Sequence, residues 1–529
     1  MRPTLFESET RQEIEIRKIA ATEPLDLSKR EPVLKSGGSI VSPPLSDAFV
    51  AIPERPAWEP GMDPAVLEAR EQASFREWMD GLIKRGQEEH IELNYFESNI
   101  ETWRQLWRVC ERSHVVLYVV DCRHPLFHFS KAILRYVRET LGKPFILVLS
   151  KADLSNEKTL SAWEKHFDEA YGIKDVIRFS SFRGYGEEAL ADGVDAALAA
   201  RRRKAAKAKK GSGGRYANAI GRKEMLDMIR KVAIAHYGGK IAAIKAVDED
   251  KIAQEEEKAK LAAEKKKGKK QKGKKKFDDD DDDEDDSSDE EEEEGVEKGE
   301  KEDDDDGKVI EGLSEKIVVG AVGDPNVGKS SLINGLARKK VVSVSRTPGH
   351  TKHFQTYHLA KDMILCDCPG MVFPAVDRPK YLQVLCGLYP LPNLREPFSA
   401  LRYVAEHYPL EKMYGVEATH PPEEGPWSPM NLAEAVATKR GYLTGRAGRP
   451  DAHRAVREIL RDCVDGSVPI MWSPPNEDSA KNFEIELTED RERIARATEK
   501  YYTIHPEFRP KKEEKKEDEE EKEKEKDEE

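Results

Sequence analysis

The eight residues Gly-Asp-Pro-Asn-Val-Gly-Lys-Ser at 323–330 constrain the fold of this chain more than any other feature. They match the pattern G-x-x-x-x-G-K-[ST], follow an apolar run at 317–322, and precede an expected helix over 331–336. Glycines let such a loop curl so that backbone N–H groups face phosphate oxygens, and the helix N-terminus adds positive potential. The strand, loop and helix therefore predict a nucleoside-phosphate site in an α/β fold.

Two residues of this loop carry distinct chemistry. Lys329 can reach the β- and γ-phosphates, and Ser330 can ligate Mg²⁺. The rival interpretation is a glycine turn without a ligand, which does not account for the strand and the helix on either side. The other residues expected to line the phosphates are Asp324, Pro325, Asn326, Val327, Gly328 and Ser331.

A second motif, Asp-Cys-Pro-Gly at 367–370, follows an apolar run at 363–366. An aspartate at a strand end can hold Mg²⁺ through water, and a glycine can turn its N–H toward a γ-phosphate. The motif by itself also fits an Asp-initiated turn. Its position about 40 residues after the phosphate loop, behind a strand of its own, favours roles for Asp367 and Gly370 at the nucleotide.

Between these motifs lies the segment Arg-Thr-Pro-Gly-His-Thr at 346–351. A threonine in a mobile loop here can complete the Mg²⁺ shell when a γ-phosphate is bound, and Thr351 is the candidate, with Thr347 as the alternative. An ordinary Pro-Gly turn is the competing interpretation. Together with Lys329 and Gly370, Thr351 forms the expected catalytic set.

The base-reading residues are expected far upstream of the phosphate loop. No N-K-x-D sequence follows the second motif, whereas Ser-Lys-Ala-Asp at 150–153 follows an apolar run at 145–149. Asp153 can accept from both the N1–H and the 2-amino group of guanine, a donor pair that adenine lacks. Lys151 can lay its stem along the base. Ser150 replaces the usual asparagine, which weakens one contact to the base or the phosphate loop.

A further strand candidate at 175–179 is followed by Ser180 and Ser181, and the Ser181 N–H can be offered to guanine O6. The predicted strands alternate with helical stretches at 130–141 and 157–171, which is typical of a parallel sheet with crossover helices. The base loops therefore precede the phosphate loop, the segment at 346–351, which is the expected first switch, and the motif at 367–370, which is the expected second switch. A P-loop fold accommodates this order when its old termini are joined and new ones open after the second switch.

Charge is segregated along the chain. Charged residues make up 36%, the net charge is -14 and the mean hydropathy is -0.72. Nine lysines at 265–276 are followed by fifteen acids at 278–294, and such blocks cannot bury a core, so about 240–310 is expected to be disordered. The lysines suit nonspecific phosphate-backbone binding, nuclear targeting or a solvated linker equally well. No apolar run reaches the ~18 residues of a membrane helix.

These patterns predict an α/β P-loop fold, circularly permuted, with a C-terminal helical region and disordered charged segments. The expected divisions are a partly disordered N-terminal extension at 1–90 with a helix near 64–85, a first G-domain half at 91–200, a charged insert at 201–310, a second half at 311–375, a helical region at 376–505 and a charged tail at 506–529.

The motifs in this order resemble the circularly permuted GTPases of the YlqF/YawG family. The resemblance covers about 90–200 and 310–470, interrupted by the charged insert. The stretches that carry it are YFESNIETWRQLWRVCERSHVVLYVVDCRHP at 95–125, GDPNVGKSSLINGL at 323–336, VVSVSRTPGHTKHFQTYHL at 341–359 and CDCPGMVFP at 366–374.

The resemblance implies a helical region tethered to the second switch, GTP hydrolysis to GDP with Mg²⁺, and a role on a ribosomal or other RNA–protein particle. Asn326 stands where similar loops coordinate K⁺, which can stabilise transition-state charge. Met371 stands where many GTPases place a water-orienting glutamine, so slow turnover is expected, and a scaffold that holds GTP with negligible turnover is the alternative. The expected protein is a monomer of the nucleus or nucleolus, and also of the cytoplasm.

Overall fold

A computed structural model gives the fold of the chain. The expected site residues Ser181, Thr347 and Thr351 lie outside the described residues, as do the lysine and acid blocks and residues 510–529 of the charged tail. The described residues are 10–35, 38–45, 50–59, 61–88, 93–180, 221–237, 316–337, 341, 355–360, 362–376, 378–418, 427–445 and 448–509.

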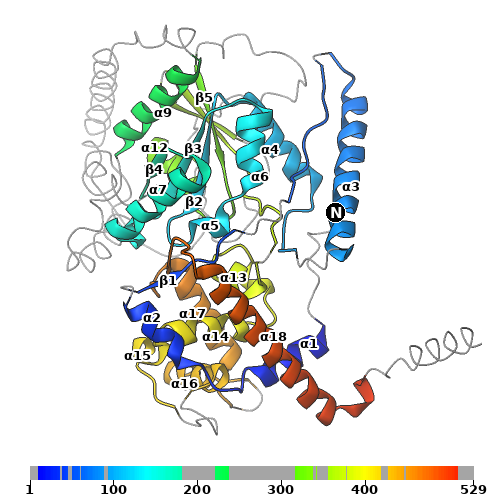
Figure 1. Cartoon of the computed structure of the whole chain (residues 1–529), viewed down its shortest axis with the longest axis vertical. Helices are drawn as coiled ribbons and strands as arrows, with labels where there is room; N and C mark the ends of the chain where they lie inside the picture. Colours follow the sequence, from blue (N-terminus) through cyan, green and yellow to red (C-terminus); the bar gives the residue numbers. More distant parts are fainter. Residues whose placement is uncertain are drawn as a thin grey trace, which may run out of the picture.

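A six-stranded sheet in the order β4-β3-β2-β5-β7-β6 forms the centre of the upper half of the molecule (Figure 1). All neighbouring strands are parallel except β6, which runs antiparallel to β7 at one edge. The strands are β2 (Val115–Asp121), β3 (Phe145–Ser150), β4 (Val176–Arg178), β5 (Ile317–Val322), β6 (Gln355–Ala360) and β7 (Met363–Asp367). The expected α/β fold with a parallel sheet is confirmed, and the three strands of the first half (β4, β3, β2) join the three strands of the second half (β5, β7, β6) through the pairing of β2 with β5.

Continuous apolar runs form the central strands because both faces of this sheet are covered. Side chains alternate between faces, so Val116 and Tyr118 of β2 enter one core while Leu117 and Val119 enter the other. The first face is covered by α4 (Ile100–Arg112), α6 (Lys131–Arg135) with the π-helical turn η2 (Tyr136–Thr140), and α7 (Glu157–Tyr171). The second face is covered by α9 (Arg222–Tyr237) and α12 (Lys329–Ala337).

The segment that enters α4 lies beside the segment that leaves the second switch. Asn94 fixes this junction: its Nδ2 donates to the carbonyl of Phe373 at 2.9 Å and its Oδ1 accepts from the N–H of Ala375 at 2.6 Å. Leu93 and Val376 form an antiparallel bridge next to it. The start of the first half and the end of the second half therefore adjoin, as a circularly permuted sheet requires.

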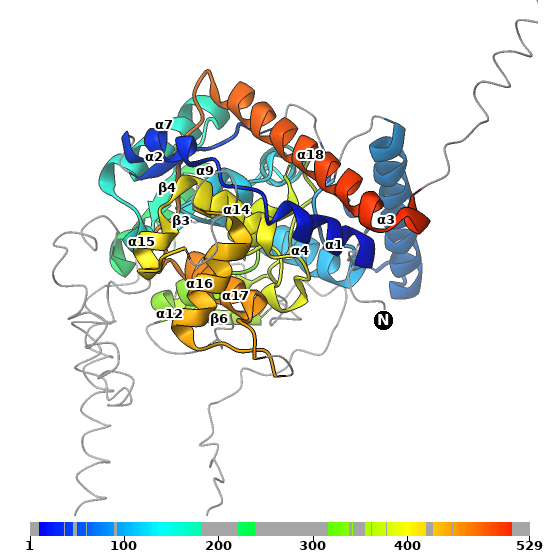
Figure 2. The ribbon, with the colours of Figure 1, turned by 90° about the horizontal axis from the view of Figure 1, so that it is seen from below.

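The chain after the second switch forms a helical region beneath the sheet (Figures 1 and 2). Its elements are α13 (Lys380–Leu385), η6 (Leu391–Asn393), α14 (Phe398–His407), α15 (Leu410–Tyr414), α16 (Pro429–Arg440), α17 (Ala452–Asp465), β8 (Met471–Ser473), α18 (Ser479–Ile504) and η7 (Pro506–Phe508). Leu432, Val456 and Trp472 of this region belong to the same hydrophobic core as Val116 and Tyr118. One face of the sheet and the helical region therefore share a single core.

The N-terminal segment returns to this C-terminal region. β1 (Ser39–Val41) pairs in parallel with β8, and α1 (Arg11–Ala20) packs on α18 through Ile16, Ala20, Ala497 and Tyr501. The other N-terminal elements are η1 (Leu27–Lys29), α2 (Arg30–Lys35) and the long helix α3 (Pro64–Glu88). The short helix α5 (Pro125–His128) follows β2. Sequence patterns predicted the helix near 64–85 but not the contacts of residues 10–45 with the C-terminal region, because these partners lie from 370 to 490 positions away.

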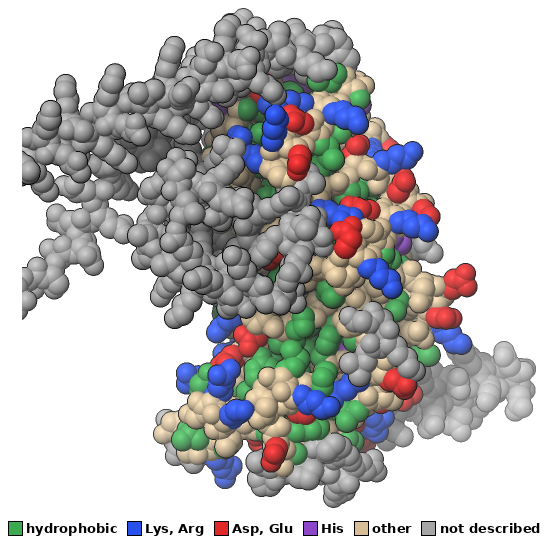
Figure 3. Space-filling view, turned by 90° about the vertical axis from the view of Figure 1, so that its left-hand side faces the viewer, with side chains coloured by type: hydrophobic (Ala, Val, Ile, Leu, Met, Phe, Trp, Pro, Cys, Tyr) green, Lys and Arg blue, Asp and Glu red, His purple; other side chains and the backbone are tan. Residues whose placement is uncertain are grey.

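The surface differs between the two halves of the molecule. In Figure 3, hydrophobic side chains gather over the lower part, where Figure 1 places the helical region, whereas charged side chains of both signs are dispersed over the upper part. A groove of about 340 Å³ between α15, α16 and α17 contains Met413, Val416, Val436 and Val468. Among the described residues, no helix combines the length and apolar character required to cross a bilayer.

Candidate nucleotide-binding site

The phosphate loop lies between β5 and α12, at the carboxyl edge of the sheet. Three of its residues have positive φ angles, namely Gly323 (153°), Asn326 (60°) and Gly328 (103°), as a loop that curls around an anion requires. A Cβ on Gly323 would lie 2.4 Å from the carbonyl oxygen of Val119, so the first glycine also permits close packing against β2. α12 begins at Lys329 and directs its N-terminus toward this loop.

Lys329 is buried inside the loop. Its Nζ donates to the carbonyl oxygens of Gly323 at 2.8 Å and Asp324 at 2.6 Å. Burial lowers the pKa of the ammonium, while the carboxylate of Asp367 opposes that shift. The ammonium therefore bonds backbone oxygens of its own loop and lies near the carboxylate of Asp367.

Asp367 ends β7 beside Lys329 and is 1% exposed. Neither carboxylate oxygen has a hydrogen-bond partner within the described part of the chain. Burial raises the pKa of this carboxyl to about 6, with the Lys329 charge acting against the rise. A buried carboxylate without partners is compensated by a bound cation, so Asp367, with the Ser330 hydroxyl at the start of α12, fits Mg²⁺.

Gly370 lies against the phosphate loop. A Cβ at this position would lie 2.9 Å from Lys329 Nζ and 3.0 Å from the Cα of Pro325, so only glycine fits. The second switch therefore touches the loop directly at the residue expected to turn toward the γ-phosphate. Thr351, the expected partner from the first switch, falls outside the described residues.

The residues expected to read the base lie beside the phosphate loop. The hydroxyl of Ser150 hydrogen-bonds with the carbonyl oxygen of Val327 and lies 2.8 Å from that of Val120. The expected loss of a contact at Ser150 thus leaves its link to the phosphate loop in place. Asp153 is 5% exposed, and its Oδ1 accepts from the Ser180 hydroxyl at 2.8 Å. Ser180 therefore orients the carboxylate, while Ser181 falls outside the described residues.

Lys151 has a φ of 54°, a left-handed conformation uncommon for a residue with a side chain. Its Nζ lies 2.7 Å from Oδ2 of Asp121, the last residue of β2. Arg123 contacts the same carboxylate through its Nε at 3.0 Å and Nη2 at 2.7 Å. Sequence reasoning missed Asp121 and Arg123, although a charged residue at the carboxyl end of a parallel strand was the available signal.

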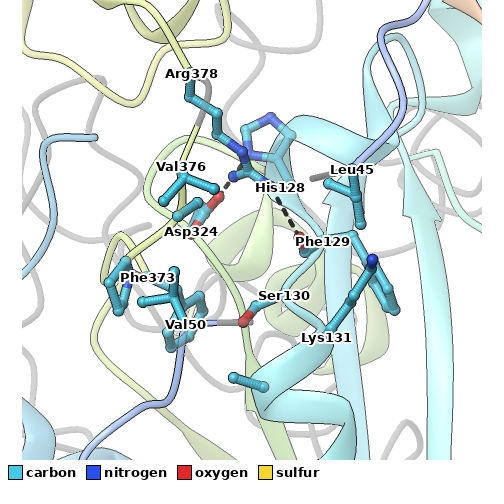
Figure 4. A pocket seen from close by; sticks show the side chains of 13 residues that line it. Leu45, Val50, His128, Phe129, Ser130, Lys131, Asp324, Phe373, Val376 and Arg378 are labelled. Carbon is cyan, nitrogen blue, oxygen red and sulfur yellow. Dashed lines mark hydrogen bonds and ion pairs between the residues drawn. The ribbon is translucent and has the colours of Figure 1, made fainter. Parts of the chain in front are cut away.

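The side chain of Asp324 enters a small cavity rather than the centre of the phosphate loop (Figure 4). Its Oδ2 lies 2.9 Å from Nδ1 of His128, and both residues are buried. The cavity has a volume of about 50 Å³ and is also lined by Phe373 and Arg378. Burial lowers the pKa of His128 to about 4, so a neutral imidazole hydrogen-bonds with the carboxylate. Asp324 therefore contributes its backbone to the loop and its side chain to the core.

The helical region touches both loops of the site. Nδ2 of Asn326 donates to the carbonyl oxygen of Gly387, which follows α13, at 3.0 Å. Gly466, which follows α17, packs so close to Leu154 that a Cβ would lie 2.7 Å from Leu154 Cδ1. One glycine from the helical region thus adjoins the phosphate loop, and another adjoins the base-reading loop.

The structure brings together the expected phosphate, metal and base residues at one edge of one sheet. This arrangement can bind a nucleoside phosphate with its phosphates at the loop before α12 and its base beside β3. The expected residues that contribute to this edge are Ser150, Lys151, Asp153, Ser180, Asp324, Pro325, Asn326, Val327, Gly328, Lys329, Ser330, Ser331, Asp367 and Gly370.

Comparison with known proteins adds independent findings. Residues 318–385 match the family model described as 50S ribosome-binding GTPase. Guanine nucleotide-binding protein-like 1 of Homo sapiens is 35% identical over 483 residues, which cover 89% of this chain and 72% of the relative. Large subunit GTPase 1 homolog of Mus musculus is 32% identical over 449 residues, 81% of this chain and 67% of the relative. The GNP-bound structure of YlqF from T. maritima is 18% identical, with a TM-score of 0.36 and coverage of 71% of this chain and 98% of that one.

The strand order, the phosphate loop and the upstream base-reading loop define a P-loop GTP-binding protein with a circularly permuted G domain. The similarity to the human relative extends through both halves of this domain and into the helical region. The chain belongs to the guanine nucleotide-binding protein-like 1 family.

Proposed function

We propose that this protein hydrolyses GTP to GDP and phosphate, with slow intrinsic turnover, and that the nucleotide state controls its association with a ribosomal or other RNA–protein particle. The observation that carries the proposal is the buried carboxylate of Asp367 next to Lys329, whose oxygens accept no hydrogen bond from the described residues, with Gly370 packed against the phosphate loop. Such an arrangement is suited to a metal-bound triphosphate.

In this proposal Lys329 and the backbone N–H groups of the phosphate loop bind the β- and γ-phosphates, and Ser330, Asp367 and Thr351 hold Mg²⁺. The metal would neutralise charge that develops on the phosphate oxygens. Gly370 orients its N–H toward the γ-phosphate and so links the presence of that phosphate to the position of the following chain. Asp153 and Lys151 recognise the base, and Ser180 holds the Asp153 carboxylate.

Slow turnover is supported by Met371, which is 1% exposed. A buried thioether neither accepts nor donates strong hydrogen bonds, so it does not orient an attacking water. Asn326 commits its amide nitrogen to Gly387 and leaves the amide oxygen as the atom suited to K⁺. Activation is therefore proposed to come from K⁺ at Asn326 or from a partner.

The switch role is supported by the contacts between the site and the helical region. Ten positions separate Gly370 from the start of α13, and the intervening Met371, Val372 and Phe373 are buried in the shared core. Hydrophobic side chains gathered on the helical region, with the groove beside α16, suit a macromolecular partner (Figure 3). The family descriptions that mention a 50S ribosome and a large subunit support an RNA–protein particle as that partner. We propose a monomer that acts in the nucleus or nucleolus and also in the cytoplasm.

The test measures phosphate release from GTP by purified protein in K⁺ and in Na⁺ buffer, with and without ribosomal particles. Lys329→Ala serves as the matched inactive control. We expect slow release alone, faster release with K⁺ or particles, and sedimentation with particles that differs between GTP and GDP. Release equal to the Lys329→Ala control under every condition would rule out hydrolysis.

The alternative is a scaffold that binds GTP with negligible turnover, which the burial of Met371 also favours. This alternative predicts particle association that depends on GTP, together with release no faster than the Lys329→Ala control. The same measurements therefore separate the two functions, and crosslinking to RNA in the same fractions identifies contact with the particle's nucleic acid.

A further inference from the structure

A buried chain of charged groups connects the base-reading loop to the helical region. It begins at Lys151, whose Nζ lies 2.7 Å from Oδ2 of Asp121. The same carboxylate accepts from Arg123 Nε at 3.0 Å, from Arg123 Nη2 at 2.7 Å and from the Arg123 backbone N–H at 3.0 Å. Asp121 is thus held by the planar guanidinium on one side and by the base-reading lysine on the other.

Arg123 in turn bonds the last turn of α17. Its Nη1 donates to the carbonyl oxygen of Cys463 at 2.8 Å, and its Nη2 donates to that of Val464 at 2.9 Å. Carbonyls at a helix C-terminus lack intrahelical partners and carry partial negative charge, so a cation is favourable there. The backbone carbonyl of Arg123 also accepts from the N–H of Trp472 in β8 at 2.7 Å. Arg123 therefore contacts α17 with its side chain and β8 with its backbone.

Every charged group in this chain is positioned by its neighbours. Asp121 and Arg123 are 1% and 2% exposed, and the Arg123 and Lys151 charges hold the pKa of Asp121 well below its usual range. Separating a buried ion pair leaves an uncompensated charge, which costs free energy. Asp121 and Arg123 are therefore held in their observed positions. Because Lys151 also has a left-handed backbone, its ammonium and backbone are both constrained.

We propose that Asp121 and Arg123 are positioning residues for guanine recognition, which tie Lys151 to the carboxyl end of α17. The inference rests on the proposed base-reading role of Asp153 and Lys151. The contact of Gly466 with Leu154, one residue beyond Asp153, provides a second link between the same two parts. Guanine selectivity then depends on the position of α17 relative to the base-reading loop. By thermodynamic reciprocity, guanine binding stabilises that position of α17.

The test measures the affinities of the full chain and its variants for GTP and for ATP, by competition with a fluorescent guanine nucleotide. Arg123→Lys retains charge but cannot bond Asp121 in a bidentate manner and both carbonyls at once. Asp121→Asn removes the charge at constant size, and Gly466→Ala acts from the helical side. We expect each to reduce the preference for GTP over ATP by about tenfold, within the range of typical coupling between sites.

Arg230→Lys is the matched control. Arg230 of α9 bonds Asp362 through Nε at 2.8 Å and Nη2 at 3.0 Å. Asp362 precedes β7, so this pair lies at the opposite edge of the parallel sheet from the base-reading loop, which follows β3. The control should leave the GTP preference unchanged. A merely structural role of Arg123 would weaken GTP and ATP equally, and an unchanged ratio in both Arg123→Lys and Asp121→Asn would overturn the proposal.

Asp153→Asn separates this inference from the proposed base-reading role. If Asp153→Asn abolishes the preference while Arg123→Lys and Asp121→Asn retain it, the positioning role is wrong and the base-reading role stands. If Asp153→Asn itself retains the preference, the base-reading role is wrong and this inference falls with it. Thermal melting of each variant confirms that the compared proteins are folded.

Discussion

The two ends of the nucleotide site are prepared differently. At the base end, Asp153 accepts from Ser180, Lys151 pairs with Asp121, and Ser150 bonds the phosphate loop. At the phosphate end, both oxygens of Asp367 lack partners among the described residues. The base end is thus ordered in advance, which favours selectivity, whereas the phosphate end is incomplete until ligand supplies the missing charge.

This difference has a physical rationale. Guanine is recognised by a fixed pattern of donors, so a carboxylate locked in place rejects the wrong base most strongly. Phosphate and metal instead bring their own charge, so a switch benefits from groups that are better satisfied after binding. The comparison predicts opposite responses of the two ends to mutation.

The largest expected effect belongs to the phosphate end. Lys329→Ala removes the cation that the loop encloses and should lower nucleotide affinity by at least about a thousandfold, equally for GTP and GDP. Titration with a fluorescent GTP analogue measures it. Retained affinity within about tenfold of the unmodified protein would show that the phosphates are bound elsewhere.

At the base end, selectivity should change more than affinity for phosphate. Asp153→Asn replaces one acceptor oxygen with a donor and should reduce the preference for GTP over ATP by about a hundredfold or more. Competition binding with GTP, ATP and xanthosine triphosphate measures the change. An unchanged ratio would refute the assignment of Asp153.

Stability of the nucleotide-free protein should change in opposite directions at the two ends. Asp367→Asn removes a buried charge whose pKa is raised to about 6, and should stabilise the folded state by about 2 kcal/mol at pH 7.5. Asp153→Asn converts the charge-assisted bond from Ser180 into a weaker neutral one and should destabilise the folded state by about 1 kcal/mol. Thermal melting without nucleotide compares them, and stabilisation by added Mg²⁺ and GTP should be lost in Asp367→Asn.

A smaller effect, on the pH dependence of stability, is expected from the buried histidines His124 and His128. Burial lowers the pKa of His124 to about 3 and of His128 to about 4, while Asp121 and Asp324 oppose these shifts and Arg123 and Lys151 add to that of His124. The unfolded chain therefore binds protons below about pH 6.5 that the folded chain does not, so stability falls between pH 6.5 and pH 4.5.

Replacing one of these histidines tests this assignment. His124→Leu should reduce the pH dependence of stability in this window by about 1.4 kcal/mol per pH unit at most, the value for one proton. Melting curves between pH 7 and pH 4.5 measure it, with His505→Asn at the surface as the control. Equal pH dependence in His124→Leu and the unmodified protein would contradict the assignment.

Sequence reasoning predicted much of the sheet and the loops at its edge. The helix expected over 157–171 appears as α7 (Glu157–Tyr171), and the apolar run at 317–322 forms β5. Each of these was predictable because its signal lies in adjacent residues: an apolar period, a capping residue or a turn. The edge strand β6 was missed, since its half-exposed Gln355–Ala360 has no continuous apolar run.

The residues that were not predicted have partners far away in the chain. Arg123 bonds carbonyls about 340 positions later, and His128 meets Asp324 across 196 positions. Asp324 was expected to line the phosphates because it lies within the phosphate loop. Its side chain instead points into the core and contacts His128. Only the tertiary structure reveals such roles, because it brings these distant residues into contact.

The sequence by itself determined that this chain has a phosphate loop, a second switch and an upstream base-reading loop, and that their order is permuted. These depend on contiguous residues whose backbone needs are local. Tertiary structure alone decided that the N-terminal segment joins β8, that the helical region shares the core of the sheet, and that Asp121 and Arg123 link it to the base-reading loop. Burial and ion pairing depend on which surfaces meet in space, and no local pattern encodes that meeting.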